Sequence, residues 1–430
     1  MSAIPDNSAT TARSEFAHHW RALAAATVGI AFGLGALPFY TYGLFIPGLE
    51  EDFGWSRTSL SALQMVGSLV IVLTGPFVGI LVDRFGVRWL ATVSLVAMGV
   101  AYLLLATSGP DFSRFATIWV LMYVLGAAST AVAFTRPVNE RFDQARGIAL
   151  GIAVGGAGVV ALVVPTVLGS LVAEDWRLVY RILSLAIFAS ALVVFALTPQ
   201  HARTAVRRQS VSAPAGAIFR SWLFVRLSVS FFLLALAVAW LVIHLVPMLR
   251  DEGVSPGAAG TIAGLIGIAV IVGRLGAGLL VDRFFAPAVA AAFFTLAAAG
   301  FGALLIGGPV LAPAAAFGVG LAMGAEIDLI GYLTARYFGM SSYSRVFGVL
   351  YSAFTLGMGI SPLLMAKVHS ATGDYTAPLL LAISLMFVAV IMVVTLPRFK
   401  ASSPSPHPSI RLGASTSVAS GSRRTDRPAR

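Results

Sequence analysis

The chain has 430 residues, of which 58% are hydrophobic and only 11% are charged. Soluble domains carry about 25% charged residues, so this composition excludes a water-soluble protein and indicates that the lipid bilayer is the solvent. The chain has no cysteine, which excludes disulfides and thiolate metal sites, and its net charge of +11 raises the question of a nucleic-acid partner.

Long apolar runs fill the chain in two sets of six. Each run is expected to form one transmembrane helix, because a helix that crosses a bilayer needs about 20 apolar residues. The first set lies at residues 22–48, 59–82, 90–108, 116–138, 147–173 and 180–198. The second set lies at residues 221–248, 257–281, 288–307, 312–336, 346–368 and 377–397. The sequence therefore predicts an all-α membrane protein with twelve transmembrane helices in two six-helix halves.

Polar segments flank and separate the two predicted halves. Residues 1–20 and 399–430 carry no pattern that could form a core, and we expect both to be disordered cytoplasmic tails, the second of them basic. Residues 199–220 form a polar, arginine-containing linker on the cytoplasmic side. This linker joins an N-terminal half at 21–198 to a C-terminal half at 221–398.

The positions of lysine and arginine predict the orientation in the membrane. With both termini in the cytoplasm, most of the 29 basic residues fall in cytoplasmic segments. This distribution follows the positive-inside rule, so we attribute the net charge to topology and expect no nucleic-acid partner. The outer segments carry acids such as Glu50, Asp52 and Asp251, which we interpret as solvated loop ends. We expect a monomeric, multi-pass protein surrounded by the lipids of the cell inner (plasma) membrane.

A charged hairpin occurs twice, once in each predicted half. The first copy reads Gly79-Ile80-Leu81-Val82-Asp83-Arg84-Phe85-Gly86-Val87-Arg88, and the second begins at Gly278. A glycine permits a tight turn between two helices, and the charges can lock helix bundles together on one side of the membrane. We therefore predict a gating hairpin, formed by Gly79, Asp83, Arg84, Gly86, Arg88, Asp282 and Arg283.

In these hairpins the sequence resembles the major facilitator superfamily, whose signature reads Gly-x-Leu-x-Asp-Arg-x-Gly-Arg-Arg/Lys. Val87 departs from it at a position that is usually basic, and Phe285 replaces the second glycine of the repeat. The resemblance covers residues 20–398. It implies that two six-helix halves rock about a central site and open that site to each side in turn.

Other motifs resemble the monocarboxylate-transporter-like branch, which includes oxalate/formate exchangers. The segments Phe53–Arg57, Arg141–Ala153 and Tyr337–Gly339 are typical of its bacterial members. This resemblance implies a small organic anion as the substrate, with a proton or a counter-anion as its coupling partner.

Arg274 is the strongest candidate for a substrate contact, because it lies inside the eighth apolar run. A charge at membrane depth costs about 2.5–3.5 kcal/mol or more, so such residues are functional candidates by default. A guanidinium can bind both oxygens of a carboxylate, although Arg274 could instead snorkel to the cytoplasmic surface. In the branch it resembles, an arginine four residues before the hairpin glycine, here Gly278, is taken to bind the substrate carboxylate.

That branch differs from this chain at two positions. Its animal members carry an aspartate one turn before the arginine, where this chain has Val270, and a lysine in the first helix, where it has Tyr40. Their proton relay therefore does not carry over, and we predict proton coupling at Glu326 and Asp328 instead. Two residues on a helix are about 200° apart, so the two acids face different ways. Either acid could neutralise Arg274 or hold a proton, and the alternative is a static buried pair.

Four further side chains are predicted to line the substrate site. His244 precedes Pro247 at the outer end of the seventh run and could relay protons or simply pack, and Trp240 is one turn away. Tyr40 and Tyr42 lie in the outer half of the first run, where they could donate hydrogen bonds to a carboxylate or belong to the interfacial belt of aromatic residues.

No phosphate loop, metal-ligand cluster or nucleophile–base spacing occurs in the sequence, so we expect neither an enzyme nor a cofactor. We predict a secondary active transporter of a small organic anion, a monocarboxylate, that works by proton symport or anion exchange. Two alternatives remain. One is an efflux carrier for amphipathic drugs or metabolites, in which Glu326 would face a cationic substrate. The other is a membrane sensor, supported only by the basic C-terminal tail.

Overall fold

The computed structural model describes residues 12–142, 145–199, 218–281, 283–339 and 342–399. The described part of the chain is built of helices, and it packs as one unit up to Leu396. The first set, here called the N-terminal helices, comprises α1 (Ala12–Ala31), α2 (Leu37–Phe53), α3 (Arg57–Phe85), α4 (Val87–Ala106), α5 (Phe112–Gly126), the 3-10 turn η1 (Ala127–Ser129), α6 (Ala131–Arg141), α7 (Arg146–Glu174) and α8 (Trp176–Leu197).

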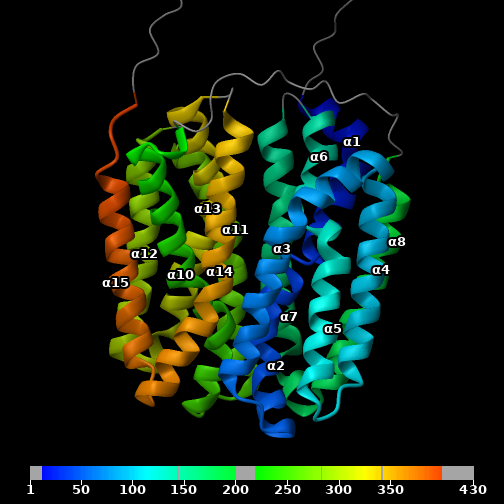
Figure 1. The fold of residues 1–430 in the computed structure, drawn as a ribbon, viewed down its shortest axis with the longest axis vertical. Coiled ribbons are helices and arrows are strands. Elements are labelled where there is room, and N and C mark those ends of the chain that lie inside the picture. Colours follow the sequence, from blue (N-terminus) through cyan, green and yellow to red (C-terminus); the bar gives the residue numbers. More distant parts are fainter. Residues whose placement is uncertain (1–11, 143–144, 200–217, 282, 340–341, 400–430) are drawn as a thin grey trace, which may run out of the picture. The chain divides into compact units, whose positions relative to one another are not determined.

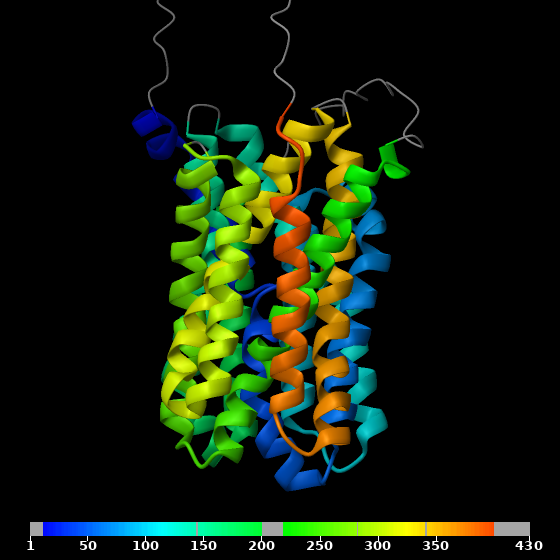
Figure 2. The same cartoon turned by 90° about the vertical axis from the view of Figure 1, so that its left-hand side faces the viewer.

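The second set, here called the C-terminal helices, follows the linker. It comprises α10 (Trp222–Asp251), α11 (Pro256–Val281), α12 (Ala286–Gly307), the 3-10 turn η2 (Gly308–Leu311), α13 (Ala312–Phe338), α14 (Tyr343–Thr372) and α15 (Thr376–Val394). Figure 1 shows the two sets side by side with their helices running roughly parallel. In Figure 2 the C-terminal helices face the viewer, and α15 runs along their surface.

Local sequence explains where most helices begin and end. Ser56, Asp111 and Asp175 each accept a hydrogen bond from a backbone N–H in the first turn of the helix that follows. Such caps satisfy N–H groups that have no partner inside a helix. Gly86, at φ 80°, ends α3 and starts α4, which is the tight turn that the first hairpin predicts. We call this end of the molecule the hairpin end and the opposite end, where α2 finishes at Phe53, the clamp end.

Ten helical stretches of the described chain are long and apolar enough to cross a membrane, against the twelve runs predicted. The first predicted run, 22–48, is divided between α1 and α2, and neither piece is among the ten. The runs at 288–307 and 312–336 follow each other through η2 and count as a single stretch, Ala286–Phe338. The structure thus establishes an all-helical protein with ten candidate spans.

Three of the predicted segments, the N-terminal tail, the linker and the C-terminal tail, can be compared with the described residues. α1 begins at Ala12, so residues 12–20 are helical where a disordered tail was expected. The backbone N–H of Ala145 donates to the buried Glu15 carboxylate at 3.0 Å, which anchors this helical extension. Most of the predicted linker and nearly all of the predicted C-terminal tail lie outside the described residues. The division into two halves stays a prediction.

Small residues let α7 and α11 approach closely near the clamp end. A Cβ added to Gly260 would lie 2.2 Å from the carbonyl oxygen of Pro165, and one added to Gly267 would lie 2.2 Å from the backbone nitrogen of Leu162. Toward the hairpin end, in contrast, positions on the same helices such as Gly155 have no neighbouring atom within 4 Å. Close packing of glycines is what brings helices together in lipid, and here it unites the two sets at one end only.

Candidate functional site

Two helices break in the middle of the molecule, and the two breaks touch. The chain leaves helical geometry between α1 and α2 and again around η1. At the contact, the backbone N–H of Leu34 donates to the Ser129 hydroxyl at 3.1 Å, and a Cβ on Gly33 would lie 2.0 Å from the Ser129 carbonyl oxygen. Irregular backbone at membrane depth is tolerated where protein covers it or where it lines a cavity.

The predictions missed both breaks, since each lies within a run that was expected to be one helix. The signal in the sequence was the spacing of Gly33, Gly35 and Pro38, and it was hidden by the apolar residues around it. Neither α2 nor α6 has a side-chain cap at its start, and at α2 the Leu37 N–H donates to the carbonyl oxygen of Gly33 at 3.1 Å instead.

A cavity of about 630 Å³ lies between the N-terminal and the C-terminal helices, at the level of these breaks. This volume is in the usual range for small-molecule sites, about 300–1,000 Å³. Its lining residues run from Gln64 to Val78 on α3 and from Arg345 to Met358 on α14. The cavity therefore extends from the middle of the molecule toward the hairpin end and stops short of the clamp end.

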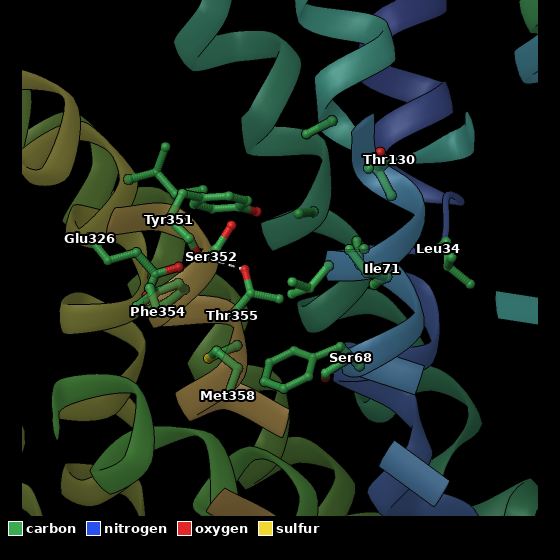
Figure 3. A pocket seen from close by; sticks show the side chains of 18 of the residues that line it. Leu34, Ser68, Ile71, Thr130, Glu326, Tyr351, Ser352, Phe354, Thr355 and Met358 are labelled. Atoms are coloured by element: carbon green, nitrogen blue, oxygen red, sulfur yellow. Dashed lines mark hydrogen bonds between the residues drawn. The ribbon is translucent and has the colours of Figure 1, made fainter. Parts of the chain in front are cut away.

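Most of the cavity wall is apolar, with a few polar groups among the hydrophobic side chains. Figure 3 shows the labelled residues on two opposite sides of the pocket: Leu34, Ser68, Ile71 and Thr130 on the N-terminal side, and Glu326, Tyr351, Ser352, Phe354, Thr355 and Met358 on the C-terminal side. An apolar pocket with few polar groups binds a ligand through its body and orients it through those groups.

Arg274 lines this cavity from α11 and is only 8% exposed. Its Nη1 donates to Asp328 Oδ2 at 3.5 Å, which is long for an ion pair. Its Nε is buried and has no hydrogen-bond partner among the residues that the structure describes. A buried cation with an unsatisfied N–H is costly, so this side chain is suited to receive an anion.

Glu326 and Asp328 face different ways, as their spacing on α13 predicts. Glu326 lines the cavity at 5% exposure, and within the described structure its Oε2 has no hydrogen-bond partner. Asp328 does not line the cavity, and its side chain is 40% exposed while it contacts Arg274. Two arginines line the cavity, the exposed Arg345 and the buried Arg274. The cavity thus holds one buried cation and one buried acid, each with a polar atom that makes no hydrogen bond to the described chain.

Of the other four predicted lining residues, only Tyr40 borders the cavity. The Tyr42 hydroxyl donates to the carbonyl oxygen of Leu60 at 3.0 Å and is buried in the core. Trp240 is also buried, with its ring stacked on Phe301 at a centroid distance of 6.1 Å. These two placements correct the prediction, because both side chains pack away from the cavity.

His244 is also placed outside the cavity, in a layer that closes it toward the clamp end. Its Nε2 lies 3.2 Å from the Ser61 hydroxyl on α3 and 3.2 Å from the carbonyl oxygen of Pro362 on α14. In the same layer, a Cβ added to Gly43 would meet the carbonyl oxygen of Ile243 at 2.2 Å. The N-terminal and C-terminal helices are therefore in direct contact here.

The predicted gating hairpin lies at the end toward which the cavity extends. Gly79 and Arg84 are in the last turns of α3, and Arg283 is exposed in the turn after α11. The guanidinium of Arg88 lies over the ring of Phe195, 4.2 Å from its centroid. Asp282 and the side chain of Asp83 lie outside what the structure describes.

The clamp end carries a cluster of charges that sequence analysis did not predict. Arg57 Nη2 is 2.8 Å from Glu50 Oε2, and Arg57 Nη1 is 2.7 Å from Asp251 Oδ2. The Tyr375 hydroxyl donates to Asp251 Oδ2 at 2.5 Å and also contacts Arg57. Burial raises the pKa of Tyr375, which keeps this hydroxyl protonated. We call these four residues the outer clamp, and it joins α2 and α3 to the C-terminal helices.

The outer clamp corrects the interpretation of the acids as solvated loop ends. Asp52 is also paired, but within the N-terminal helices. It accepts hydrogen bonds from Arg177 at 2.6 Å and from Trp176 Nε1 at 3.0 Å, and these bonds lower the pKa of its carboxyl group. The sequence could not predict these pairs because their members lie on different helices, which only the folded structure brings together.

Comparison with known proteins adds independent evidence. The model of the Major Facilitator Superfamily matches residues 28–327 and, in a second match, residues 227–428. Monocarboxylate transporter 12 from Homo sapiens is 25% identical over an alignment of 336 residues, and the match covers 67% of this chain and 65% of that protein. Monocarboxylate transporter 11 from Homo sapiens is 26% identical over an alignment of 405 residues, and the match covers 88% of this chain and 82% of that protein. Riboflavin transporter RibJ from Trypanosoma cruzi is 26% identical over 148 residues, 34% of this chain and 31% of that protein.

The match to the first of these relatives spans just under two thirds of its length. The family match covers more than half of the chain, which confirms the resemblance that the hairpin motifs indicate. The family and these relatives are transporters, which confirms that the protein is not an enzyme. The chain belongs to the major facilitator superfamily, is similar to monocarboxylate transporters 11 and 12, and is a multi-pass membrane protein.

Proposed function

We propose that this protein is a secondary active transporter of a small organic anion, a monocarboxylate, and that Arg274 binds the carboxylate. One observation carries the proposal: a buried guanidinium borders a cavity, and its Nε has no partner in the described chain. A charge-assisted hydrogen bond contributes about 1.5–3 kcal/mol, so an anion that satisfies this group gains affinity. The names of two relatives, monocarboxylate transporters 11 and 12, agree with this substrate class.

Proton coupling in this proposal belongs to the carboxyl groups around Arg274. Glu326 lines the same cavity as Arg274. Asp328 contacts Arg274 from outside the cavity, and its own side chain is more exposed than that of Arg274. A proton on Glu326 leaves a neutral acid beside the bound anion, and its loss restores an electrostatic partner for Arg274. Arg274 and Glu326 together support proton symport if Glu326 gains and loses a proton during the cycle. They support anion exchange if the protonation of Glu326 does not change.

The proposed transport cycle is alternating access between two six-helix halves, with twelve transmembrane helices and both termini in the cytoplasm of a plasma-membrane protein. In this account the hairpin end faces the cytoplasm and the outer clamp faces outward. The cavity reaches toward the hairpin end while the clamp end is closed by Arg57 and by the layer around His244. We therefore assign the described conformation to an inward-facing state.

The test is uptake into proteoliposomes by the Arg274→Ala variant. We expect saturable carboxylate uptake to be lost while expression and membrane insertion remain normal. Arg226→Ala is the matched control, because Arg226 donates to the carbonyl oxygen of Met392 at 2.9 Å and lies outside the cavity. Uptake at the normal rate by the Arg274 variant would contradict the proposal.

A second candidate function is an efflux carrier for amphipathic cations. The observation that favours it is Glu326, a buried acid in a mostly apolar cavity, whose Oε2 has no partner in the described structure. Under this reading Glu326 binds the cation and Arg274 is structural. Transport of a lipophilic cation that survives in Arg274→Ala and is lost in Glu326→Gln would favour it over the anion transporter.

A further inference from the structure

Aromatic rings form a continuous ladder along α14, on the side of the cavity that carries the charges. Tyr343 stacks on Phe347 at a centroid distance of 5.6 Å, and Phe347 stacks on Tyr351 at 5.9 Å with the ring planes 5° apart. Tyr351 continues to Phe354 at 6.2 Å. Tyr351 and Phe354, the last two rings, line the cavity. In Figure 3 the Tyr351 ring projects from α14 toward the N-terminal helices.

A second aromatic pair borders the same cavity from the N-terminal side. Phe39 and Tyr40, at the start of α2, have ring centroids 5.1 Å apart in an edge-to-face arrangement. Aromatic rings prefer stacked or edge-to-face partners and contribute about 0.5–1.5 kcal/mol beyond the area that they bury. A ligand ring between these two walls would find partners on both sides.

The size of the cavity also favours a ligand with an aromatic ring. A volume of about 630 Å³ is suited to a drug-sized ligand, and most of the lining is apolar. A carboxylate of two or three carbons can satisfy Arg274 but cannot cover the rings of Phe354 or Phe39. Burial of apolar surface is favourable in proportion to its area, so a larger apolar body gains affinity that a short acid lacks.

We propose that the substrate is an aromatic monocarboxylate, with its carboxylate on Arg274 and its ring against Tyr351 and Phe354. This inference rests on the proposed function and narrows it to one substrate class. Arg274, Glu326 and the two aromatic walls all line the same cavity, so the charged pair and the rings belong to one site.

The experiment compares uptake of labelled 3-phenylpropanoate and propanoate in proteoliposomes, with 3-phenylpropanamide and phenylalanine as competitors. We expect a half-saturation concentration for phenylpropanoate at least roughly 10-fold below that of propanoate, because a phenyl group buries far more apolar area. The amide, which has no charge for Arg274, should compete weakly.

Each other outcome has a separate meaning. Equal half-saturation concentrations for the two acids would overturn the aromatic assignment and leave the anion transporter intact. Phenylalanine as the preferred ligand would support the aromatic assignment, because it carries the same carboxylate and ring, and would add an ammonium contact at Glu326. Uptake of neither acid, together with uptake of a lipophilic cation, would overturn the proposed function itself.

Variants of the ladder supply a second readout. Tyr351→Leu should raise the half-saturation concentration for phenylpropanoate roughly 3-fold to 10-fold more than it raises that for propanoate. Tyr351→Phe keeps the ring and should restore tight binding. Phe347→Leu is the matched control, because Phe347 belongs to the same ladder but does not line the cavity. A loss that is equal for both acids in Tyr351→Leu would assign the ring a packing role and contradict the inference.

Discussion

Two mostly buried arginines of this protein have opposite surroundings. Arg57, 15% exposed, bonds to Glu50 and Asp251 at distances under 3 Å. Arg274, 8% exposed, has one contact at 3.5 Å and a buried Nε that bonds to nothing in the described chain. The first side chain is satisfied by the fold, and the second is held next to a cavity without full compensation. Both arginines are mostly buried, so the two differ in their hydrogen-bond partners, and on this difference we base the proposal that Arg274 binds the substrate.

The comparison also assigns the two ends of the molecule different roles. The outer clamp links the N-terminal to the C-terminal helices where the cavity is closed. Arg274 lies where the same helices are separated by the cavity. A transporter that exposes its site to each side in turn must break the first set of contacts and make others near the hairpin.

The largest effect is expected from locking the clamp end. The side-chain oxygens of Thr58 and Ser370 are 3.3 Å apart across α3 and α14, and the chain has no native cysteine. A disulfide, with an S–S bond of about 2 Å, should form in the double variant Thr58→Cys/Ser370→Cys and stop transport. Uptake should return on reduction. Normal uptake by fully cross-linked protein would show that this contact does not need to open.

The second prediction concerns stability and separates the two arginines. Arg57→Gln leaves Glu50 and Asp251 without their cation, so we expect the free energy of unfolding to fall by about 1–3 kcal/mol, reduced by the partial exposure of the acids. Arg274→Gln should instead raise it by about 1–3 kcal/mol, because it removes a buried cation whose Nε is unsatisfied. Thermal unfolding of both variants measures this difference.

Arg177→Gln serves as the control for the outer clamp. Arg177 pairs with Asp52 at 2.6 Å, but both belong to the N-terminal helices. The variant should therefore leave the balance between inward and outward states unchanged. Arg57→Gln should shift it outward, as measured by labelling a cysteine placed at Ser68 in the cavity from the outside. Equal labelling of the two variants would contradict the claim that the outer clamp holds the protein in the inward-facing state.

The third prediction concerns Glu326. In Glu326→Gln the side chain can no longer exchange a proton, so stimulation of uptake by an inward proton gradient should disappear. Exchange of labelled for unlabelled carboxylate should continue, because Arg274 is intact. Asp328→Asn is the comparison variant, since Asp328 does not line the cavity. A proton-stimulated Glu326→Gln transporter would assign the coupling elsewhere.

The smallest effect is expected from two neighbouring tyrosines. Tyr40 lines the cavity, whereas the Tyr42 hydroxyl donates to Leu60 in the core. Tyr40→Phe should raise the half-saturation concentration for the carboxylate by up to about 5-fold with unchanged stability, the equivalent of one hydrogen bond. Tyr42→Phe should instead lower stability by about 1 kcal/mol without changing that concentration. The opposite pattern would place the substrate against the other face of α2.

Sequence was sufficient for the family and for the main charges of the site. The repeated Asp-Arg hairpin indicates the superfamily, and an arginine inside an apolar helix is conspicuous in any sequence. Arg274 and Glu326 come from different helices, and the structure places both at one cavity. Their roles in transport remain a proposal.

What sequence missed has two physical causes. When a helix is apolar on every side, its sequence does not show which side faces the cavity. Trp240 and His244 were therefore expected at the cavity, although they face other helices. The breaks at Gly33 and Ser129 and the partners of Arg57 depend on contacts between distant segments, which no local pattern reports.

The central claim is that Arg274 makes the cavity selective for a carboxylate ligand. Equilibrium binding tests this claim most directly. Purified protein would be unfolded thermally with 3-phenylpropanoate, its amide and a lipophilic aromatic amine, each also with Arg274→Gln. A ligand at a hundred times its Kd stabilises the bound state by about 2.7 kcal/mol, which is readily measured. The account predicts stabilisation by the carboxylate alone, and its loss in the variant. Stabilisation by the amine, or by the carboxylate equally in both proteins, would contradict it.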